Sequence, residues 1–323
     1  MNSFGEGFRF TSFGESHGKA VGGVIEGVKA GSVIDLDFIR EALLRRAGKT
    51  TEAVGVSPRA VREKDDVEWL SGVKETEDGL VALGTPIAFL IRNADTKSED
   101  YEWLKEHFRP GHADLTYELK YGIRDYRGGG RASARETVAR VVAGGVAQQE
   151  LLGRGITVKA RLVQVGKETD TSRFETLLKD IQQEGDTIGG VVECCIQGMP
   201  AGVGEPIFDK LQARLAFAMM SINGCKGFSY GIGFEGVTRR GSELYLNSDG
   251  KPYSAEDHEH SEGIYGGISD GADIVFRCAF KPAATLRSVY GGRHDSCIAV
   301  RAVPVVEAMT ALCLLDLLKR AED

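Results

Sequence analysis

The chain has 323 residues, of which 42% are hydrophobic and 27% charged, with a formal net charge of −7. This composition is ordinary for a globular protein with a large core, and we predict a single domain over residues 1–323. The negative charge gives no general reason to bind nucleic acid or an anionic membrane, so we expect neither partner. An anion-binding site must therefore come from a local cluster of basic residues.

Signals of secreted, membrane-bound and metal-binding proteins are weak. Six scattered cysteines without a C-x-x-C pair are typical of reduced, buried thiols and favour a cytoplasmic protein, and no secretory signal is visible at the N-terminus. The most apolar segment, Val305 to Leu318, contains Glu307 and Asp316, so we expect it to be too short and too charged to span a bilayer. His258 and His260 have no third ligand at a suitable spacing, so we predict a solvated loop and no metal site.

Helices and strands alternate without a strict βαβ order. The first half is predicted to contain a strand at Val21–Val28, a helix at Asp37–Ala47 ending at Gly48, a strand at Ile87–Ile91, and a helix that a capping box opens at Ser133 and that runs towards Gly153. A strand at Val158–Val165, a helix from a capping box at Ser172 to Gly185, and a strand at Val191–Ile196 follow. The last predicted elements are a helix from Pro206 to Ile222, a strand at Ile274–Phe280, and a C-terminal helix begun by Pro304. This order favours antiparallel or mixed sheets over a doubly wound parallel sheet.

One segment of the first half has an echo in the second half. Val24–Gly31 resembles Cys195–Gly202, and each is a predicted strand that ends in a glycine turn before an amphipathic helix. Two similar halves within one body would explain the echo. Convergence of strand–turn–helix units on similar residues would explain it equally well.

The strongest functional signal is a basic, glycine-rich stretch at Arg124–Glu136. The chain has 42 glycines, and three of them precede Arg131 directly. Such a run lets consecutive backbone amides point at one ligand, and the capped helix that follows turns its positive end to the same place. Arg131 and Arg135 are four residues apart and can share a helical face. The stretch therefore predicts phosphate recognition, against the alternative of an exposed basic loop with surface ion pairs.

Three further glycine turns carry histidine or aspartate. Ser16 and His17 lie in Phe13–Gly18, which matches the G-x-S-x-G pattern of a hydrolase, but a strand-like segment follows in place of the required helix. The other two turns are Phe108–Asp114, with His112, and Gly291–Ser296, with Asp295. No Walker A lysine motif or strand-linked G-x-G-x-x-G occurs, so a P-loop or Rossmann nucleotide site is unsupported. Together the turns predict one active site distributed over loops.

These motifs carry a family resemblance. Phe-Gly-Glu-Ser-His-Gly at 13–18, Gly-Gly-Gly-Arg-Ala-Ser-Ala-Arg-Glu-Thr at 128–137 and Gly-Arg-His-Asp-Ser-Cys at 292–297 resemble the chorismate synthases, and the resemblance runs from Phe10 to the C-terminal helix. It implies an α+β fold, a β–α–β sandwich with central helices between antiparallel sheets and two pseudo-repeated halves, assembled as a homotetramer.

The resemblance also implies a reaction. A lyase of this family eliminates phosphate from 5-enolpyruvylshikimate 3-phosphate in an anti-1,4 sense and gives chorismate, in the shikimate pathway of aromatic amino acid biosynthesis. The elimination requires reduced FMN without net redox change, and NADPH is an indirect reductant. A flavin-dependent oxidoreductase and a non-catalytic anion-binding relative are the rival interpretations.

Residue roles follow from the same motifs. His17 resembles the family histidine beside the departing phosphate, His112 the one that keeps reduced flavin correctly protonated, and Asp295 the base that works with flavin N5. The implied cofactor contacts are Arg131, Ala132, Ser133, Asn223, Gly224, Gly266, Lys281, Pro282, Ala283, Ala284, Thr285 and Arg293. The implied substrate contacts are Ser16, Arg45 and Arg135.

The chain departs from the family pattern in several segments. The usual Arg-Arg-Arg-Pro-Gly reads Leu-Arg-Arg-Ala-Gly at 44–48. Lys49–Asp65 is longer than its counterpart, and Arg59 or Arg62 would replace the family's second arginine there. Only Leu286–Gly292 separates the flavin loop from Arg293, where family members often have a longer stretch. These departures bear on the substrate contacts and on intrinsic flavin reductase activity.

Overall fold

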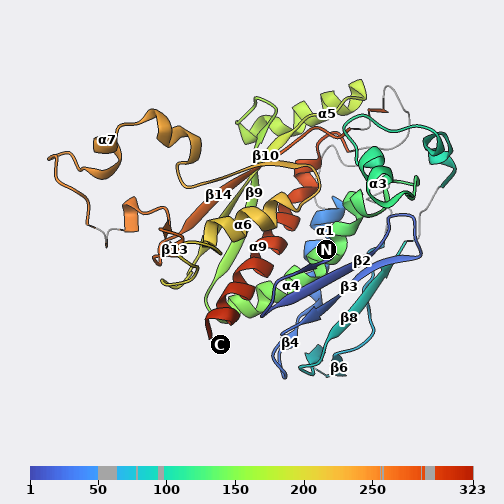
Figure 1. The fold of residues 1–323 in the computed structure, drawn as a ribbon, viewed down its shortest axis with the longest axis horizontal. Helices are drawn as coiled ribbons and strands as arrows, with labels where there is room; N and C mark the ends of the chain where they lie inside the picture. The colour runs from blue at the N-terminus through green and yellow to red at the C-terminus, as the bar shows by residue number, and fades with distance from the viewer. Residues whose placement is uncertain are drawn as a thin grey trace.

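Two antiparallel sheets face each other across a layer of helices (Figure 1). The structure is a computed structural model, and it describes residues 1–49, 64–77, 79–93, 98–254, 256, 258–284, 286–287 and 295–322. The first sheet has the order β1 (Ser3–Phe4), β2 (Arg9–Gly14), β3 (Ala20–Glu26), β8 (Ile87–Arg92) and β5 (Glu68–Trp69). The second has the order β11 (Cys225–Tyr230), β14 (Ile274–Phe280), β10 (Gly190–Gln197) and β9 (Thr157–Val165).

Smaller elements complete the chain. A three-stranded sheet has the order β4 (Val33–Ile34), β7 (Gly79–Ala82) and β6 (Val73–Thr76), and β12 (Ile264–Tyr265) pairs with β13 (Ile268–Ser269). The α-helices are α1 (Leu36–Ala47), α3 (Asp114–Tyr121), α4 (Thr137–Gly153), α5 (Phe174–Glu184), α6 (Leu211–Met220), α7 (Gly241–Tyr245) and α9 (Ile298–Glu322). The 3-10 turns are η1 (Ser98–Lys105), η2 (Gly130–Ala132), η3 (Ala134–Glu136), η4 (Thr171–Arg173), η5 (Gly233–Thr238) and η6 (His258–His260).

The helix layer is built around α4 and α9. These two helices pack along each other, α4 contacts β3 and β9, and α9 contacts β2, β9 and β10. Their apolar residues form the buried core together with the inner faces of both sheets. The predicted α+β class with helices between antiparallel sheets is confirmed. The two similar sequence segments begin in β3 and in β10, each with a strand on both sides, which agrees with two similar halves and leaves that prediction open.

Strands were predicted more accurately than helix starts. The five predicted strands correspond to β3, β8, β9, β10 and β14 with end shifts of one or two residues. Helix α1 ends at Gly48 in the left-handed conformation, as predicted, and its N-cap is Asp35. The predicted start at Pro206 is wrong, because Asp209 has φ +60° and α6 begins only at Leu211.

Two predicted capping boxes also differ from the structure. Ser133 does cap, through its side chain to the N–H of Arg135, but it opens the 3-10 turn η3 and α4 starts at Thr137. At the second box the cap is Asp170, whose carboxylate accepts the N–H of Ser172, and α5 starts at Phe174. Short polar side chains compete for the same backbone donors, which is why neighbouring candidates are easily confused.

The C-terminal helix is longer than predicted. It starts at Ile298 and passes through Pro304, because packing of the buried Ala299 and Ala302 holds the preceding turn helical despite the missing N–H. Its 25 residues are long and apolar enough to cross a membrane by length and composition, so the expectation of a segment too short to do so was wrong, but 78% of the apolar window is buried inside the protein. We therefore interpret α9 as the core helix of this fold.

The two buried acids in α9 are paired, which explains how they fit in a core helix. Asp316 is fully buried and accepts the backbone N–H groups of Glu6, Gly7 and Phe8 at 2.6, 2.9 and 3.2 Å. Glu307 accepts two hydrogen bonds from Arg45, at 2.8 and 3.0 Å, and one from the N–H of Ala160 at 2.9 Å. Buried carboxylates with this many donors are stable in an apolar environment.

The α4–α9 contact depends on a glycine. A Cβ at Gly144 would overlap the side chain of Ala308 and lie 2.8 Å from its carbonyl oxygen. We expect Gly144→Ala to lower the free energy of unfolding by about 1–3 kcal/mol, because overpacking forces the helices apart. Urea denaturation measures this. Gly153→Ala, in the same helix with nothing within 4 Å of the new Cβ, is the matched control and should be neutral or stabilising by up to about 1 kcal/mol. Equal losses in the two variants would contradict the packing argument.

Candidate active site

A glycine turn before α4 brings two predicted histidines together. Gly128, Gly129 and Gly130 have φ of +62°, +89° and +54°, a left-handed run that side chains rarely adopt. A Cβ at Gly128 would overlap the His17 ring, and a Cβ at Gly129 would lie 2.6 Å from Cε1 of His112. The two imidazoles therefore pack against consecutive residues of one turn, although they come from distant parts of the sequence.

His17 sits in a buried turn between β2 and β3. Its Nδ1 lies 3.2 Å from Oγ of Ser16, and the Ser16 N–H donates to the carbonyl of Gly130 at 3.3 Å. Ser16 is 1% exposed and His17 6% exposed. The side chain of Asn93 donates to the carbonyls of Glu15 and Gly18 at 3.0 and 2.9 Å and so closes the turn. These contacts fix the imidazole in one orientation.

His112 is held by a buried ion pair. The Asp114 carboxylate accepts Nε and Nη2 of Arg109, both at 2.8 Å, and the Arg109 N–H at 3.0 Å. Nδ1 of His112 lies 2.8 Å from the same carboxylate. The same Nδ1 also lies 3.2 Å from Nη2 of Arg109, so this nitrogen faces the ion pair, and Nε2 is on the ring edge that faces Gly129. Burial alone would raise the pKa of Asp114, but the hydrogen bonds from Arg109 and His112 hold it well below its ordinary value.

The predicted flavin segments lie against these turns. The Lys281 ammonium donates to the carbonyl of Gly111, and the Lys281 N–H donates to the carbonyl of Gly224 at 3.0 Å. The amide of Asn223 donates to the carbonyl of Ala132 at 2.9 Å. A Cβ at Gly111 would lie 3.7 Å from that of Ala284. The segments at 111–112, 131–133, 223–224 and 281–284 thus form one contiguous cluster.

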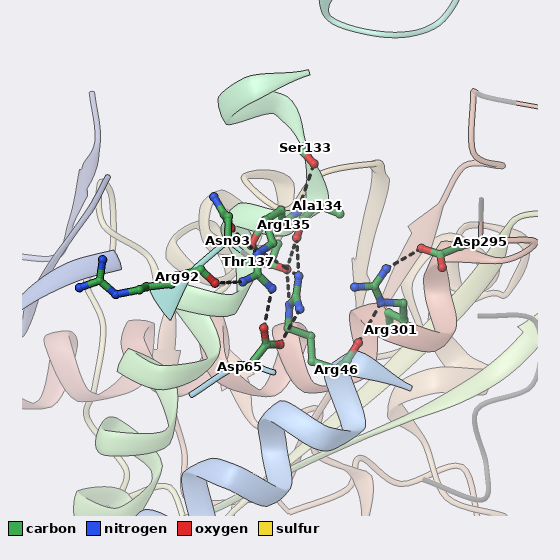
Figure 2. A network of polar contacts seen from close by, with 10 residues as sticks. All are labelled: Arg46, Asp65, Arg92, Asn93, Ser133, Ala134, Arg135, Thr137, Asp295 and Arg301. Carbon is green, nitrogen blue, oxygen red and sulfur yellow. Dashed lines mark hydrogen bonds and ion pairs between the residues drawn. The ribbon is translucent and has the colours of Figure 1, made fainter. Parts of the chain in front are cut away.

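Asp295 joins the cluster through its neighbours. The next residue, Ser296, accepts the N–H of Ile188 at 2.8 Å, and Thr187 donates to the carbonyl of Ala283 at 2.9 Å. The Asp295 carboxylate accepts Nη1 of Arg301 at 2.8 Å (Figure 2). Pro282 is exposed beside this segment.

Arg135 lies in a buried polar network that the sequence reading did not identify. Its Nη1 is 2.5 Å from Asp65, and its Nε donates to the side chain of Asn93 at 3.0 Å. Arg46, which is 1% exposed, reaches the same carboxylate at 3.4 Å and donates to Oγ1 of Thr137 at 3.0 Å (Figure 2). A sequence signal existed in the tandem Arg45-Arg46, but helical phase decides which of the two faces the site.

Charges near the turns shift the pKa of two further groups. Burial raises the pKa of Asp125, but hydrogen bonds from Arg127 and the charges of Arg127 and His17 bring it below its ordinary value. Burial, with help from the charge of Lys226, lowers the pKa of Lys281. A lysine with a lowered pKa beside the turn that carries His112 is typical of a functional site.

Not all predicted residues come to the cluster. Arg45 points away from it, pairs with Glu307 and lines a separate cavity of about 220 Å³. Gly266 lies exposed in the β12–β13 turn, which packs near Glu205 and Lys210, on the far side of the molecule from α3 (Figure 1). Arg131 donates to Ser12 Oγ at 2.6 Å and to the carbonyl of Gly14 at 3.3 Å. Four residues with predicted or suggested roles lie outside the described residues: Thr285, Arg293, Arg59 and Arg62.

The cluster offers groups that fit a flavin phosphate and its ring. Oδ1 of Asn223 is buried and, within the described part of the chain, accepts no hydrogen bond. Such an atom requires a donor, and the N–H groups of a flavin ring could supply one. The partly exposed Ser133 and Lys281 provide a hydroxyl and an ammonium donor in the same cluster. Among the described residues no group of three or more histidine, cysteine, aspartate or glutamate side chains could hold a metal ion.

Comparison with known proteins agrees with this geometry. The chorismate synthase family profile matches residues 8–318. The chain is 46% identical to the chorismate synthase of Christiangramia forsetii, covering 98% of this chain and 96% of that protein. It is 47% identical to the chorismate synthase of Phocaeicola vulgatus, covering 98% and 97%. A crystal structure of a chorismate synthase superimposes with a TM-score of 0.75 at 29% identity, covering 98% of this chain and 93% of that one.

The match extends over almost the whole chain and includes every described turn of the cluster. The family profile and the superimposed structure both point to the chorismate synthases, a family of lyases. The chain belongs to the chorismate synthase family and has that family's function, the formation of chorismate in the shikimate pathway.

Proposed function

We propose that the turn cluster is the catalytic centre and that it works with reduced FMN. The observation that carries the proposal is the packing of His17 and His112 against consecutive glycines of the turn at 128–130. Phosphate elimination from a doubly carboxylated, phosphorylated ring needs cationic and acidic groups at the leaving phosphate and a route for the departing hydrogen. Both imidazoles pack against one turn and can therefore act in the same place.

The hydrogen that must leave the substrate is poorly acidic, so a carboxylate base alone is a weak solution. Reduced flavin, when bound, would supply transient electron donation that helps to expel phosphate. The protein supplies orientation and electrostatics. We propose that Asn223, Gly224 and the segment Lys281–Ala284 hold the flavin, with the segment Arg131–Ser133 beside its phosphate.

His17 is proposed as the general acid or cation at the departing phosphate. Its buried position and its bond to Ser16 favour a fixed imidazole over a solvated one. Asn93 joins the backbone of the turn that carries His17, at the carbonyl of Gly18, to Arg135, and we propose that this cation and the acid act on the same anion. Arg135 and Ser16 remain proposed substrate contacts.

His112 and Asp295 are proposed to act on the flavin side. Nδ1 of His112 is turned to the Arg109–Asp114 ion pair, so Nε2 is the ring nitrogen that faces the glycine turn and would hold a proton at the flavin. Asp295, beside the flavin segment, is proposed as the base that works with flavin N5. Gly266 and Arg45 remain proposed contacts that the subunit's own cluster does not include.

Three broader properties are also proposed. NADPH would act as an indirect reductant of the flavin, and the enzyme would be cytoplasmic. A homotetramer is supported by the exposed apolar side chains Phe208, Phe234, Val237 and Tyr245, most of them on the arm around α7 that projects from the body (Figure 1). Light scattering would give the subunit number, and a monomer at micromolar concentration would contradict a tetramer.

An anaerobic assay tests the proposed chemistry. With reduced FMN and 5-enolpyruvylshikimate 3-phosphate, we expect phosphate release and the absorbance of chorismate, and neither product when the flavin is omitted. His17→Ala and Asp295→Ala should each lower turnover by roughly 10²-fold or more, the usual contribution of a positioned acid or base.

His107→Ala is the matched control, because its ring bonds the carbonyl of Trp103 outside the cluster, and its turnover should stay near that of the unaltered enzyme. Equal phosphate release with and without flavin would overturn the cofactor assignment. NADPH consumption in step with turnover would identify a flavin oxidoreductase in its place. Near-normal turnover in either active-site variant would remove that residue from the mechanism.

The glycine turn itself can be tested. We expect Gly128→Ala to lower turnover at least roughly 10-fold, because the new methyl group displaces the His17 ring and small displacements of catalytic groups are costly. Gly122→Ala is the control, since Gly122 has the similar φ of +71° but nothing within 4 Å of its Cβ. Similar turnover in the two variants would show that backbone strain, and not the contact with His17, determines the effect.

The depressed pKa of Asp114 gives a pH prediction. A carboxyl group whose pKa is lower in the folded state stabilises the protein above its unfolded pKa of about 3.9, and this stability is lost as the pH falls through the folded value. Asp114→Asn should therefore be less stable by roughly 3 kcal/mol at pH 7, and the difference should shrink below about pH 4. Urea denaturation between pH 3 and 7 measures it, with the exposed Asp249→Asn as control. A difference independent of pH would contradict the ionised Asp114 in this cluster.

A further inference from the structure

The side chain of Arg301 connects Asp295 to a distant part of the fold. Arg301, in the first turn of α9, donates from Nη1 to the Asp295 carboxylate at 2.8 Å. It donates from Nε to the backbone carbonyl of Arg46 at 2.9 Å. The Asp295 and Arg301 side chains are only 12% and 15% exposed. The guanidinium therefore bridges the carboxylate and the C-terminal end of α1 in a largely buried space (Figure 2).

Arg46 is itself fixed to the start of α4. Besides its bond to Thr137, its guanidinium donates to the carbonyl of Ala134 at 2.9 Å and contacts Asp65 at 3.4 Å. Its side chain is among the largest that are fully buried. Ala134 follows directly on the segment at 131–133 and the glycine turn. A continuous set of contacts thus runs from the turn that holds the histidines, through Arg46, to Arg301 and Asp295.

We propose that Arg301 is a positioning residue that sets the Asp295 carboxylate relative to the glycine turn, using the backbone of Arg46 as its fixed point. This inference rests on the proposed catalytic role of Asp295. The planar guanidinium suits the task, because separate N–H groups of one rigid fork can bond the carboxylate and the carbonyl at once. The ammonium of a lysine carries the charge without that rigid geometry.

Positioning differs from a purely structural role in how mutations combine. If Arg301 acts only through Asp295, its loss has no further effect on catalysis once the carboxylate is gone. If it only stabilises the fold, its effect on turnover is independent of residue 295 and the two losses multiply. A double-mutant cycle separates these cases.

The experiment compares Arg301→Met, Asp295→Asn and the double variant in the anaerobic assay with reduced FMN. We expect Arg301→Met to lower kcat roughly 10- to 100-fold with KM for the substrate within about threefold, because misplacing a catalytic group costs turnover and not binding. The double variant should be within about threefold of Asp295→Asn alone. Arg301→Lys should recover part of the lost kcat.

Arg214→Met is the matched control. Arg214 also pairs with a buried acid of α9, Asp316 at 3.2 Å, but at the other end of the helix, and its side chain is 19% exposed. It should lower the thermal midpoint, leave kcat within about twofold, and combine multiplicatively with Asp295→Asn. Multiplicative losses of kcat for the 295–301 pair would overturn the positioning role.

A second readout does not depend on activity. In the ligand-free protein, the losses of Tm for Arg301→Met and Asp295→Asn should be clearly less than additive, because both remove the same contact. Additive losses would overturn the proposed pairing whatever the enzyme does. Absence of any chorismate from the unaltered enzyme would instead reject the proposed chemistry, and the Tm cycle would still decide whether Arg301 holds Asp295.

Discussion

The site depends on one steric constraint, the absence of side chains at the turn formed by Gly128, Gly129 and Gly130. All three residues are in the left-handed region, and the first two lie directly against imidazole rings. A Cβ at Gly128 or Gly129 would occupy the space of His17 or His112. The turn can therefore act as the common wall that brings together two rings almost one hundred residues apart in the sequence.

The cations of the site are held by internal carboxylates. Arg109 pairs with Asp114, Arg135 with Asp65, and Arg301 with Asp295. Removing either partner of such a pair leaves an uncompensated charge in a poorly solvated place. Each carboxylate therefore holds its arginine in position, and each arginine holds its carboxylate. A protein of net charge −7 can in this way orient several arginines towards an anion without a large basic surface.

The motif-bearing turns and most strands could be predicted from the sequence, because glycine runs, β-branched segments and cap residues act locally. The residues of the turns at 13–18, 108–114 and 128–130 predicted that these turns share one site, but which atoms meet there depends on strand pairing and could not be predicted. The roles of Arg45 and Arg46 depend on helical phase at the end of α1, which a tandem arginine does not reveal. Asp65 and Arg301 were missed because their importance lies in contacts with residues distant in the chain.

The predictions of two helix starts were wrong for a related reason. Pro206 and Pro304 look alike in sequence as first-turn residues, yet one lies in a bend and the other inside α9. The difference comes from Asp209 in the left-handed region in the first case and from core packing around Ala302 in the second. Tertiary context thus placed the helix start after the proline in the first case and before the proline in the second.

The most direct test of the account is a long-range 1H–15N spectrum of histidine-labelled protein, recorded anaerobically before and after addition of reduced FMN. The rings of His17 and His112 should both change their chemical shifts on binding, while those of the exposed His107 and of His258 and His260 in η6 should not. A spectrum in which neither His17 nor His112 responds to bound flavin would contradict the central claim that both imidazoles lie against the glycine turn in one active site that includes the flavin.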